Sequence, residues 1–159
     1  MLSDLLLLVR TKLEADLLCR ELECLEEALF MTDTGGWNEI LRTKVRLSVA
    51  EIISYEFPQD IEGRRKQLRE LKESLLNLPV VNLTLAIEPT LDLVTELSNH
   101  LRDAVNAEII LDIQSDSLIV GGAVITFQGR FGDYSAASKM ERAWNENSAN
   151  LISIAYGNK

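Results

Sequence analysis

The chain contains few of the residues from which catalytic and metal sites are built. Its 159 residues include two cysteines and one histidine. Cys19 and Cys24 lie five positions apart on a predicted helix, so they point to different faces, and without a second pair they do not make a zinc site. His100 stands without a serine, cysteine or carboxylate partner at catalytic spacing. We therefore expect no catalytic residues, no metal, no cofactor and no enzymatic activity.

The sequence also lacks long apolar runs and an excess of basic residues. Leu5–Val9 is an apolar run of five residues, whereas a membrane-spanning helix needs about 20, and Asp4 stands where a signal peptide carries bases. Acidic residues outnumber basic ones by 25 to 16, which gives a net charge of −9. Such a charge repels phosphate backbones and anionic lipid surfaces. These features favour a cytoplasmic protein with no nucleic-acid partner and no direct membrane insertion.

Leucines at helical spacing dominate the first half of the chain. Apolar positions separated by three and four residues predict helices that pack against one another. Three helices are expected: Leu2–Phe30, Trp37–Phe57 and Ile61–Leu78. Pro58 ends the second one, because the residue before a proline is pushed out of the helical region. The pattern therefore predicts a helical arm or three-helix bundle over residues 1–78.

Leu6, Val9 and Leu13 are the candidate partner-binding residues of this half. They lie on one face near the free end of the predicted first helix. A helix of about 30 residues spans about 45 Å, so this end either overhangs the rest of the protein or folds back on the other two helices. Overhanging leucines would need a partner, whereas folded-back leucines would be core. We expect a compact bundle with one remaining apolar groove, in which a partner helix would lie.

Residues 79–159 alternate between strand and helix patterns, with four strands expected: Val80–Ile87, Ala107–Ile113, Ala123–Phe127 and a short one after Gly129-Arg130. Two helices are expected: one opened by Glu88-Pro89 and one over Ser135–Asn147. A strand, a helix and a strand in this order favour a parallel crossover. The tail Leu151–Tyr156 alternates, which predicts an extra strand or a partner-binding end. The fold class is therefore α+β: the helical arm or bundle, then a small α/β domain with a mixed four-stranded sheet and two helices.

Ser117–Met140 combines several structural signals in a fixed order. Gly121-Gly122 precedes a β-branched strand, and Gly129 marks a turn. Asp133-x-Ser135 then leads into a helix, with Ser135 as its expected N-cap. The glycine pair lacks the Lys-Ser/Thr and the strand–loop–helix setting of a phosphate loop. A bulge or a close approach of two backbones is the more typical use of glycine at such a place.

In this order the signals resemble the C-terminal domain of the F-type ATP synthase delta subunit, the bacterial counterpart of the mitochondrial oligomycin-sensitivity subunit. The resemblance begins near Asn82, and its motif consists of five structural residues: Gly121, Gly122, Gly129, Asp133 and Ser135. It implies a non-catalytic stator subunit that joins the catalytic head to the peripheral stalk. Stalk b subunits would bind the C-terminal domain, and alpha subunits of the head would bind the N-terminal one. The protein would then be cytoplasmic and peripheral to the membrane, as part of a complex.

Two alternatives remain open at this point. In the delta family the N-terminal domain is a bundle of about six helices, whereas the sequence here predicts three. A helical arm followed by a small α/β head also resembles the E stalk subunit of V-type and archaeal ATPases. A small regulatory α/β domain that binds a protein partner or a ligand, with no link to an ATPase, is the second alternative.

Overall fold

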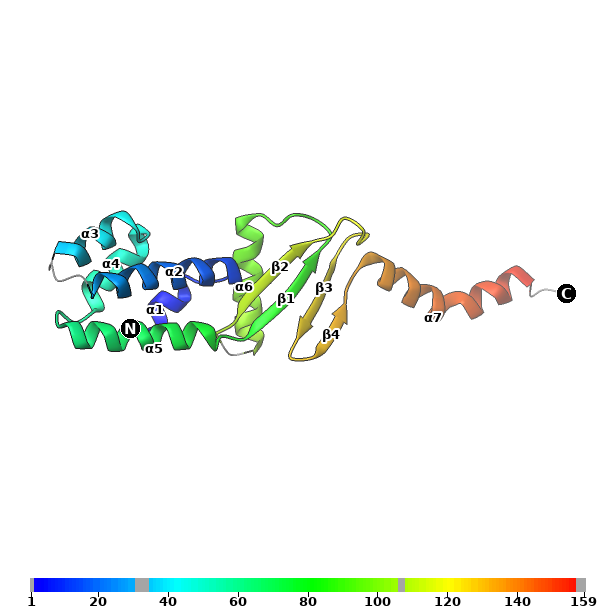
Figure 1. Cartoon of the computed structure of the whole chain (residues 1–159). Coiled ribbons are helices and arrows are strands. Elements are labelled where there is room, and N and C mark those ends of the chain that lie inside the picture. Colours follow the sequence, from blue (N-terminus) through cyan, green and yellow to red (C-terminus); the bar gives the residue numbers. More distant parts are fainter. Residues whose placement is uncertain (1, 31–34, 106–107, 157–159) are drawn as a thin grey trace. The chain divides into compact units, whose positions relative to one another are not determined.

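A computed structural model describes residues 2–30, 35–105 and 108–156 of the chain (Figure 1). These residues form seven helices and a four-stranded sheet, so the predicted α+β class with a helical N-terminal region is confirmed. The chain divides into two compact units. The first contains Met1–Val80 and Thr95–Leu111, and the second contains Val81–Val94 and Asp112–Lys159. The division into domains at residues 78 and 79 stays a prediction.

Helices α1 (Leu2–Leu7) and α2 (Lys12–Ala28) occupy the place of the predicted first helix, so the prediction of one unbroken helix is wrong. Thr11 breaks it as an N-cap with an extended backbone. Its side chain accepts a hydrogen bond of 3.2 Å from the backbone of Glu14, and the Glu14 carboxylate accepts one of 3.0 Å from the backbone of Thr11. This capping box stabilises a new helix start. The chain is held at the same point by a 2.8 Å bond from the Leu111 amide to the Arg10 carbonyl.

The predicted second helix is also divided, into α3 (Gly35–Thr43) and α4 (Leu47–Glu56). The buried carboxylate of Glu21 lies at this break and binds the backbone and side chain of Arg46. The predicted third helix is confirmed as α5 (Ile61–Leu76) and ends two residues early. The described residues before the sheet therefore form five helices, where the leucine spacing predicts three.

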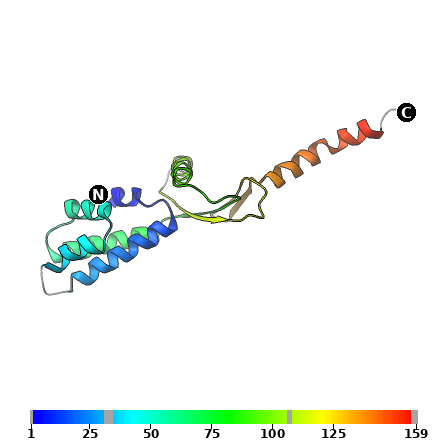
Figure 2. The same ribbon diagram turned by 90° about the horizontal axis from the view of Figure 1, so that it is seen from above.

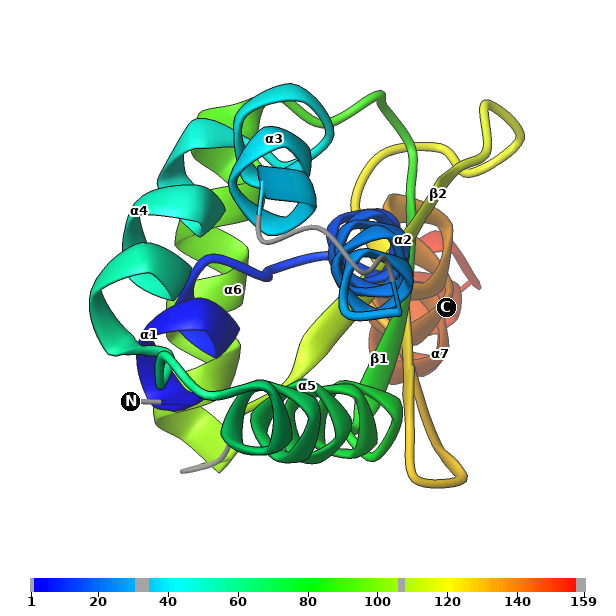
Figure 3. The same cartoon turned by 60° about the vertical axis from the view of Figure 1, so that its left-hand side comes forward.

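One leucine-rich core joins helices α1 to α5 of the first unit. Helix α2 packs against α3 and α5, and α4 packs against α1 and α3 (Figures 2 and 3). The core contains three leucines of α2, three of α5 and apolar residues of the other helices: Leu18, Leu22, Leu25, Leu68, Leu71, Leu75, Leu5, Trp37, Val49 and Ile53. Arg64 covers this core on one side, with its guanidinium carbon 4.5 Å from the centre of the Trp37 ring.

The sheet has the strand order β2-β1-β3-β4. Its strands are β1 (Val80–Leu85), β2 (Ile110–Ser115), β3 (Ala123–Phe127) and β4 (Arg130–Asp133). The pairs β1–β3 and β3–β4 are antiparallel. Strands β1 and β2 run the same way in Figure 1, with backbone bonds from Ile110 to Pro79 and from Asp116 to Leu85. The mixed four-stranded sheet is therefore confirmed. Ala107, the predicted start of the second strand, lies outside the described residues.

Two helices accompany the sheet, as predicted: α6 (Leu91–Val105) and α7 (Ala136–Tyr156). Helix α7 continues well beyond the predicted end at Asn147, and its backbone is helical through the tail. The prediction of an extra strand at Leu151–Tyr156 is therefore wrong, because a period-two pattern of six residues is too short to outweigh continuation of an existing helix.

Arg102 of α6 donates to the carbonyls of Val9 and Ile109, and burial lowers the pKa of its guanidinium.

Candidate partner-binding surfaces

The described residues offer no constellation typical of a catalytic or metal site. No group of three or more His, Cys, Asp or Glu side chains within them is arranged to hold a metal ion. Both cysteines are free thiols, and burial raises the pKa of Cys19. His100 is exposed on α6, where its Nδ1 lies 2.9 Å from the Glu96 carbonyl. Among the described helices none has the length and apolar character needed to cross a bilayer.

The glycine pair lies where two backbones meet at the start of α7. Gly121 and Gly122 have φ values of +66° and +89°, which L-residues rarely adopt. A Cβ atom on Gly122 would collide with the Tyr134 carbonyl oxygen. The Gly121 carbonyl accepts a 2.9 Å hydrogen bond from the Ala136 amide. The pair therefore serves as a close backbone contact between the loop before β3 and the first turn of α7.

Gln128 and Gly129 form the turn between β3 and β4. Their φ values are +48° and +76°, and Phe127 lies opposite Arg130 in the register of the two strands. Positive φ at both central residues of a two-residue loop is the geometry that matches the twist of a hairpin. Gly129 thus lies in the turn that the sequence predicts, and a Cβ atom there would meet no atom within 4 Å.

Asp133 and Ser135 build the N-terminus of α7. The Asp133 carboxylate accepts a 2.8 Å bond from the Ser135 amide, and this bond lowers the pKa of Asp133. The Ser135 hydroxyl accepts a 3.2 Å bond from the Ser138 amide, the geometry of an N-cap. Arg142 donates to the Asp133 carbonyl at 2.8 Å. Asp133 and Ser135 thus both stabilise the first turn of this helix.

Leu6, Val9 and Leu13 do not share a face, because the capping box at Thr11 separates them. Leu6 and Val9 are 7% and 1% exposed and belong to the core, whereas Leu13 is 72% exposed on α2. Of these three residues, Leu13 alone is exposed enough to contact a partner. A role in partner binding stays a prediction for all three residues.

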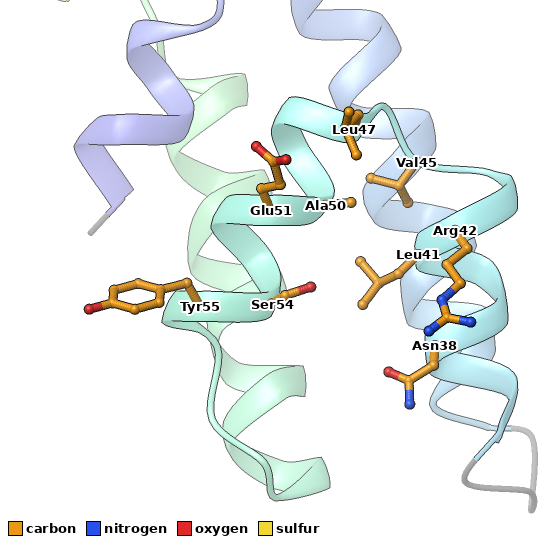
Figure 4. A pocket seen from close by; sticks show the side chains of 9 residues that line it. All are labelled: Asn38, Leu41, Arg42, Val45, Leu47, Ala50, Glu51, Ser54 and Tyr55. Atoms are coloured by element: carbon orange, nitrogen blue, oxygen red, sulfur yellow. The ribbon is translucent and has the colours of Figure 1, made fainter.

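A groove lies between α3 and α4, a place that the sequence did not predict because it predicted one helix there. The groove has a volume of about 640 Å³ (Figure 4). Nine residues line it: Asn38, Leu41, Arg42, Val45, Leu47, Ala50, Glu51, Ser54 and Tyr55. A second hollow of about 400 Å³ lies on the α2 side of the same turn. Its lining includes Leu17, Arg20, Cys24 and Lys44, and it shares Val45 with the groove.

Helix α7 carries a further apolar surface in the second unit. Met140 and Trp144 are one helical turn apart and are both largely exposed. Residues at this spacing lie on the same face of a helix. Large apolar side chains on one exposed face are typical of a protein–protein contact.

Comparison with known proteins gives these surfaces a context. The sequence model of the ATP synthase delta (OSCP) subunit family matches residues 42–146, from the end of α3 into α7. The chain belongs to this family. The ATP synthase subunit delta of Methylorubrum populi is 24% identical over 110 residues, and the match covers 69% of this chain and 56% of the relative. The same protein of Methylorubrum extorquens gives the same identity and coverage. The chain thus spans little more than half the length of these curated relatives.

The family match also covers all five motif residues. The matched range contains the glycine pair, the turn at Gly129 and the Asp133–Ser135 cap, together with the whole sheet. It starts inside the helical unit, so α1 and α2 lie outside it. The resemblance inferred from the motif alone is therefore confirmed, and it extends further upstream than Asn82. Membership of the delta family also favours the F-type assignment over the E stalk subunit.

Proposed function

We propose that this chain is a non-catalytic stator subunit of an F-type ATP synthase, which joins the catalytic head to the peripheral stalk. The observation that carries the proposal is the family match over residues 42–146. A stator subunit acts by holding its partners in place, so it needs complementary surfaces and no reacting groups. The exposed apolar residues and the absence of a metal cluster among the described residues agree with such a role.

The proposal assigns partners to the two parts of the chain. Stalk b subunits would bind the second unit, where Met140 and Trp144 of α7 provide aromatic and thioether contact area. Alpha subunits of the head would bind the helical unit. The protein would then lie on the cytoplasmic side of the membrane, attached to it only through the complex.

Reconstitution with purified subunits tests the proposal. The full chain is mixed with the catalytic head of the same source, with the soluble segment of stalk subunit b, or with both. We expect separate binary complexes and a ternary complex on size-exclusion chromatography, and no ATP hydrolysis by the chain alone. A Met140→Ser, Trp144→Ser double variant should lose the b segment and keep the head. Failure to bind either partner at micromolar concentrations contradicts the proposal.

A further inference from the structure

Helix α7 has no packing partner within its own unit. Beyond its first turns, no described helix or strand of the second unit lies alongside it (Figures 1 and 2). Every side chain from Lys139 to Glu146 is exposed, including Met140 at 71% and Trp144 at 61%. A helix in water gains most of its stability by packing an apolar face, so α7 needs a partner that its own unit does not supply.

The sequence of α7 has the spacing of a coiled-coil seam. Spacings of three and four residues alternate along the helix, and its backbone is helical from Ala136 to Tyr156. Six positions form the seam: Ala137, Met140, Trp144, Asn147, Leu151 and Ile154. They correspond to positions a and d of the heptad, which face the other helix in a two-stranded coiled coil. We call these six positions the α7 seam.

The α7 seam complements itself when two copies run antiparallel. Opposed directions bring the first seam position of one helix level with the last of the other, so Ala137 is level with Ile154 of the second copy. Met140 is likewise level with Leu151. A small residue thus faces a large one at each end, and facing residues of unequal size fill an interface evenly.

The central pair of this arrangement is Trp144 with Asn147 of the second copy. An indole N–H can only donate a hydrogen bond, whereas the oxygen of a carboxamide accepts one. Each copy therefore supplies the polar group that the other needs at this level. Parallel copies would place Trp144 against a second Trp144, which is two donors without an acceptor, and Ala137 against Ala137, which leaves the seam uneven in width.

Charge does not oppose the pairing of two α7 helices. The whole chain carries a net charge of −9, but α7 has two bases and two acids, which cancel: Lys139, Arg142, Glu141 and Glu146. Beside the seam, at heptad positions e and g, Glu141 is the only charged residue in α7. The remaining e and g positions hold Ala136, Ala143, Ser148, Asn150 and Ala155. Two identical helices can therefore approach without placing like charges opposite each other.

We infer that α7 pairs with α7 of a second copy in an antiparallel two-helix coiled coil, so that the free chain is a reversible dimer. The inference goes beyond the proposed function, since it concerns the chain before assembly. A stalk b segment that uses Met140 and Trp144 competes with the second copy for the same face. The seam is short, so the dimer gives way to a larger interface. This competition alone rests on the proposed function.

Sedimentation equilibrium of the full chain tests the pairing. The mass should rise from that of the 17.9 kDa monomer towards twice this value between low micromolar and submillimolar concentrations. Trp144→Glu should weaken association at least about tenfold, because it places a carboxylate in each half of the seam. Lys139→Gln makes the same change of net charge at an exposed position outside the seam, so it should associate as the unchanged chain does. A monomer at every concentration, or equal association of the two variants, overturns the inference.

Cross-linking determines the direction of the two helices. Both natural thiols are first removed by Cys19→Ser and Cys24→Ser. In this background Met140→Cys and Leu151→Cys should each stay uncross-linked alone in a glutathione redox buffer, whereas a mixture of the two should form a disulfide-linked dimer, because only facing positions bring two Cβ atoms within reach. A disulfide formed by the Met140→Cys chain alone, and none in the mixture, means a parallel pair and overturns the arrangement.

The soluble segment of stalk subunit b separates this inference from the stator role. If both hold, adding the segment converts the dimer into a complex with one copy of the chain. If the chain binds head and stalk but is a monomer at every concentration, the pairing of α7 is wrong and the stator role stands. If the dimer forms but neither head nor stalk binds, the stator role is wrong and the pairing stands. A dimer that binds the segment without dissociating overturns the shared face.

Discussion

The carboxylate of Glu21 on α2 binds both the backbone and the side chain of Arg46, between α3 and α4. One carboxylate oxygen accepts from the Arg46 amide at 2.9 Å and from Nε at 2.8 Å, and the other accepts from Nη2 at 2.9 Å. This bond raises the pKa of Arg46. Arg46 is the N-cap residue of α4 and makes no side-chain cap bond of its own, so Glu21 satisfies the backbone amide at the entry to this helix from another helix. It therefore fixes the turn beside which the groove lies.

Glu21→Ala should lower the free energy of unfolding by about 2 kcal/mol, because it removes hydrogen bonds to a charged group and leaves the part-buried Arg46 amide without its partner. Urea denaturation measures the change. Glu62→Ala is the control, since Glu62 pairs with Arg65 at an exposed site and such pairs contribute below about 1 kcal/mol. Equal midpoints for the two variants would show that Glu21 does not hold the turn.

Gly122→Ala should destabilise the second unit by roughly 2–4 kcal/mol. The added Cβ atom would collide with the Tyr134 carbonyl oxygen, and the backbone at position 122 has a positive φ. Steric overlap therefore adds to backbone strain. Gly129→Ala is the matched control, because its φ is also positive but no atom lies within 4 Å. Its cost should stay near 1–2 kcal/mol. Chemical denaturation compares the two, and a larger loss at Gly129 contradicts the close contact.

Ser135→Ala should cost about 1 kcal/mol, since α7 loses the acceptor at its N-terminus. Ser74→Ala serves as the control, because the Ser74 hydroxyl is exposed and only donates to a carbonyl of its own helix. That change should stay within about 0.5 kcal/mol. An unchanged denaturation midpoint in the Ser135 variant would falsify the cap.

Asp133 should make stability depend on pH in acid. Its pKa is lowered in the folded protein by the Ser135 amide, so the unfolded chain takes up the proton first as pH falls. The stabilisation is complete above the ordinary pKa of an aspartate, about 3.9, and is lost as pH falls below it through the lowered pKa of Asp133. Asp133→Asn should reduce the loss of melting temperature between pH 5 and pH 3. Asp103→Asn, at an exposed site on α6, is the control, and equal slopes for the two variants contradict the prediction.

Local signals in the sequence were enough to predict the third strand and the entry to α7. The strand at Ala123–Phe127 and the Ser135 cap depend on residues that are neighbours in sequence, and both are observed. The broken helices depend on other information. Thr11-x-x-Glu14 is a visible capping box, but the leucine spacing runs across it without interruption. The Glu21–Arg46 bond joins residues 25 positions apart, so no local pattern reveals it, and the place of the groove beside it could not be predicted for the same reason.

Leu6→Glu should lower stability much more than Leu13→Glu, although the sequence predicts both leucines on one face of a helix. Leu6 is part of the core, and a buried unpaired carboxylate should cost at least about 3 kcal/mol. Leu13 is exposed, so its replacement should change stability by no more than about 0.5 kcal/mol.

Hydrogen exchange of the Leu6→Glu variant also tests the predicted domain boundary at residue 79. If the two parts of the chain fold independently, amides of α2 and α5 lose protection while those of β3 and β4 keep theirs. The Leu13→Glu variant should retain protection throughout. Loss of protection in β3 together with α2 means that the chain unfolds as one cooperative unit, and the predicted boundary is then wrong.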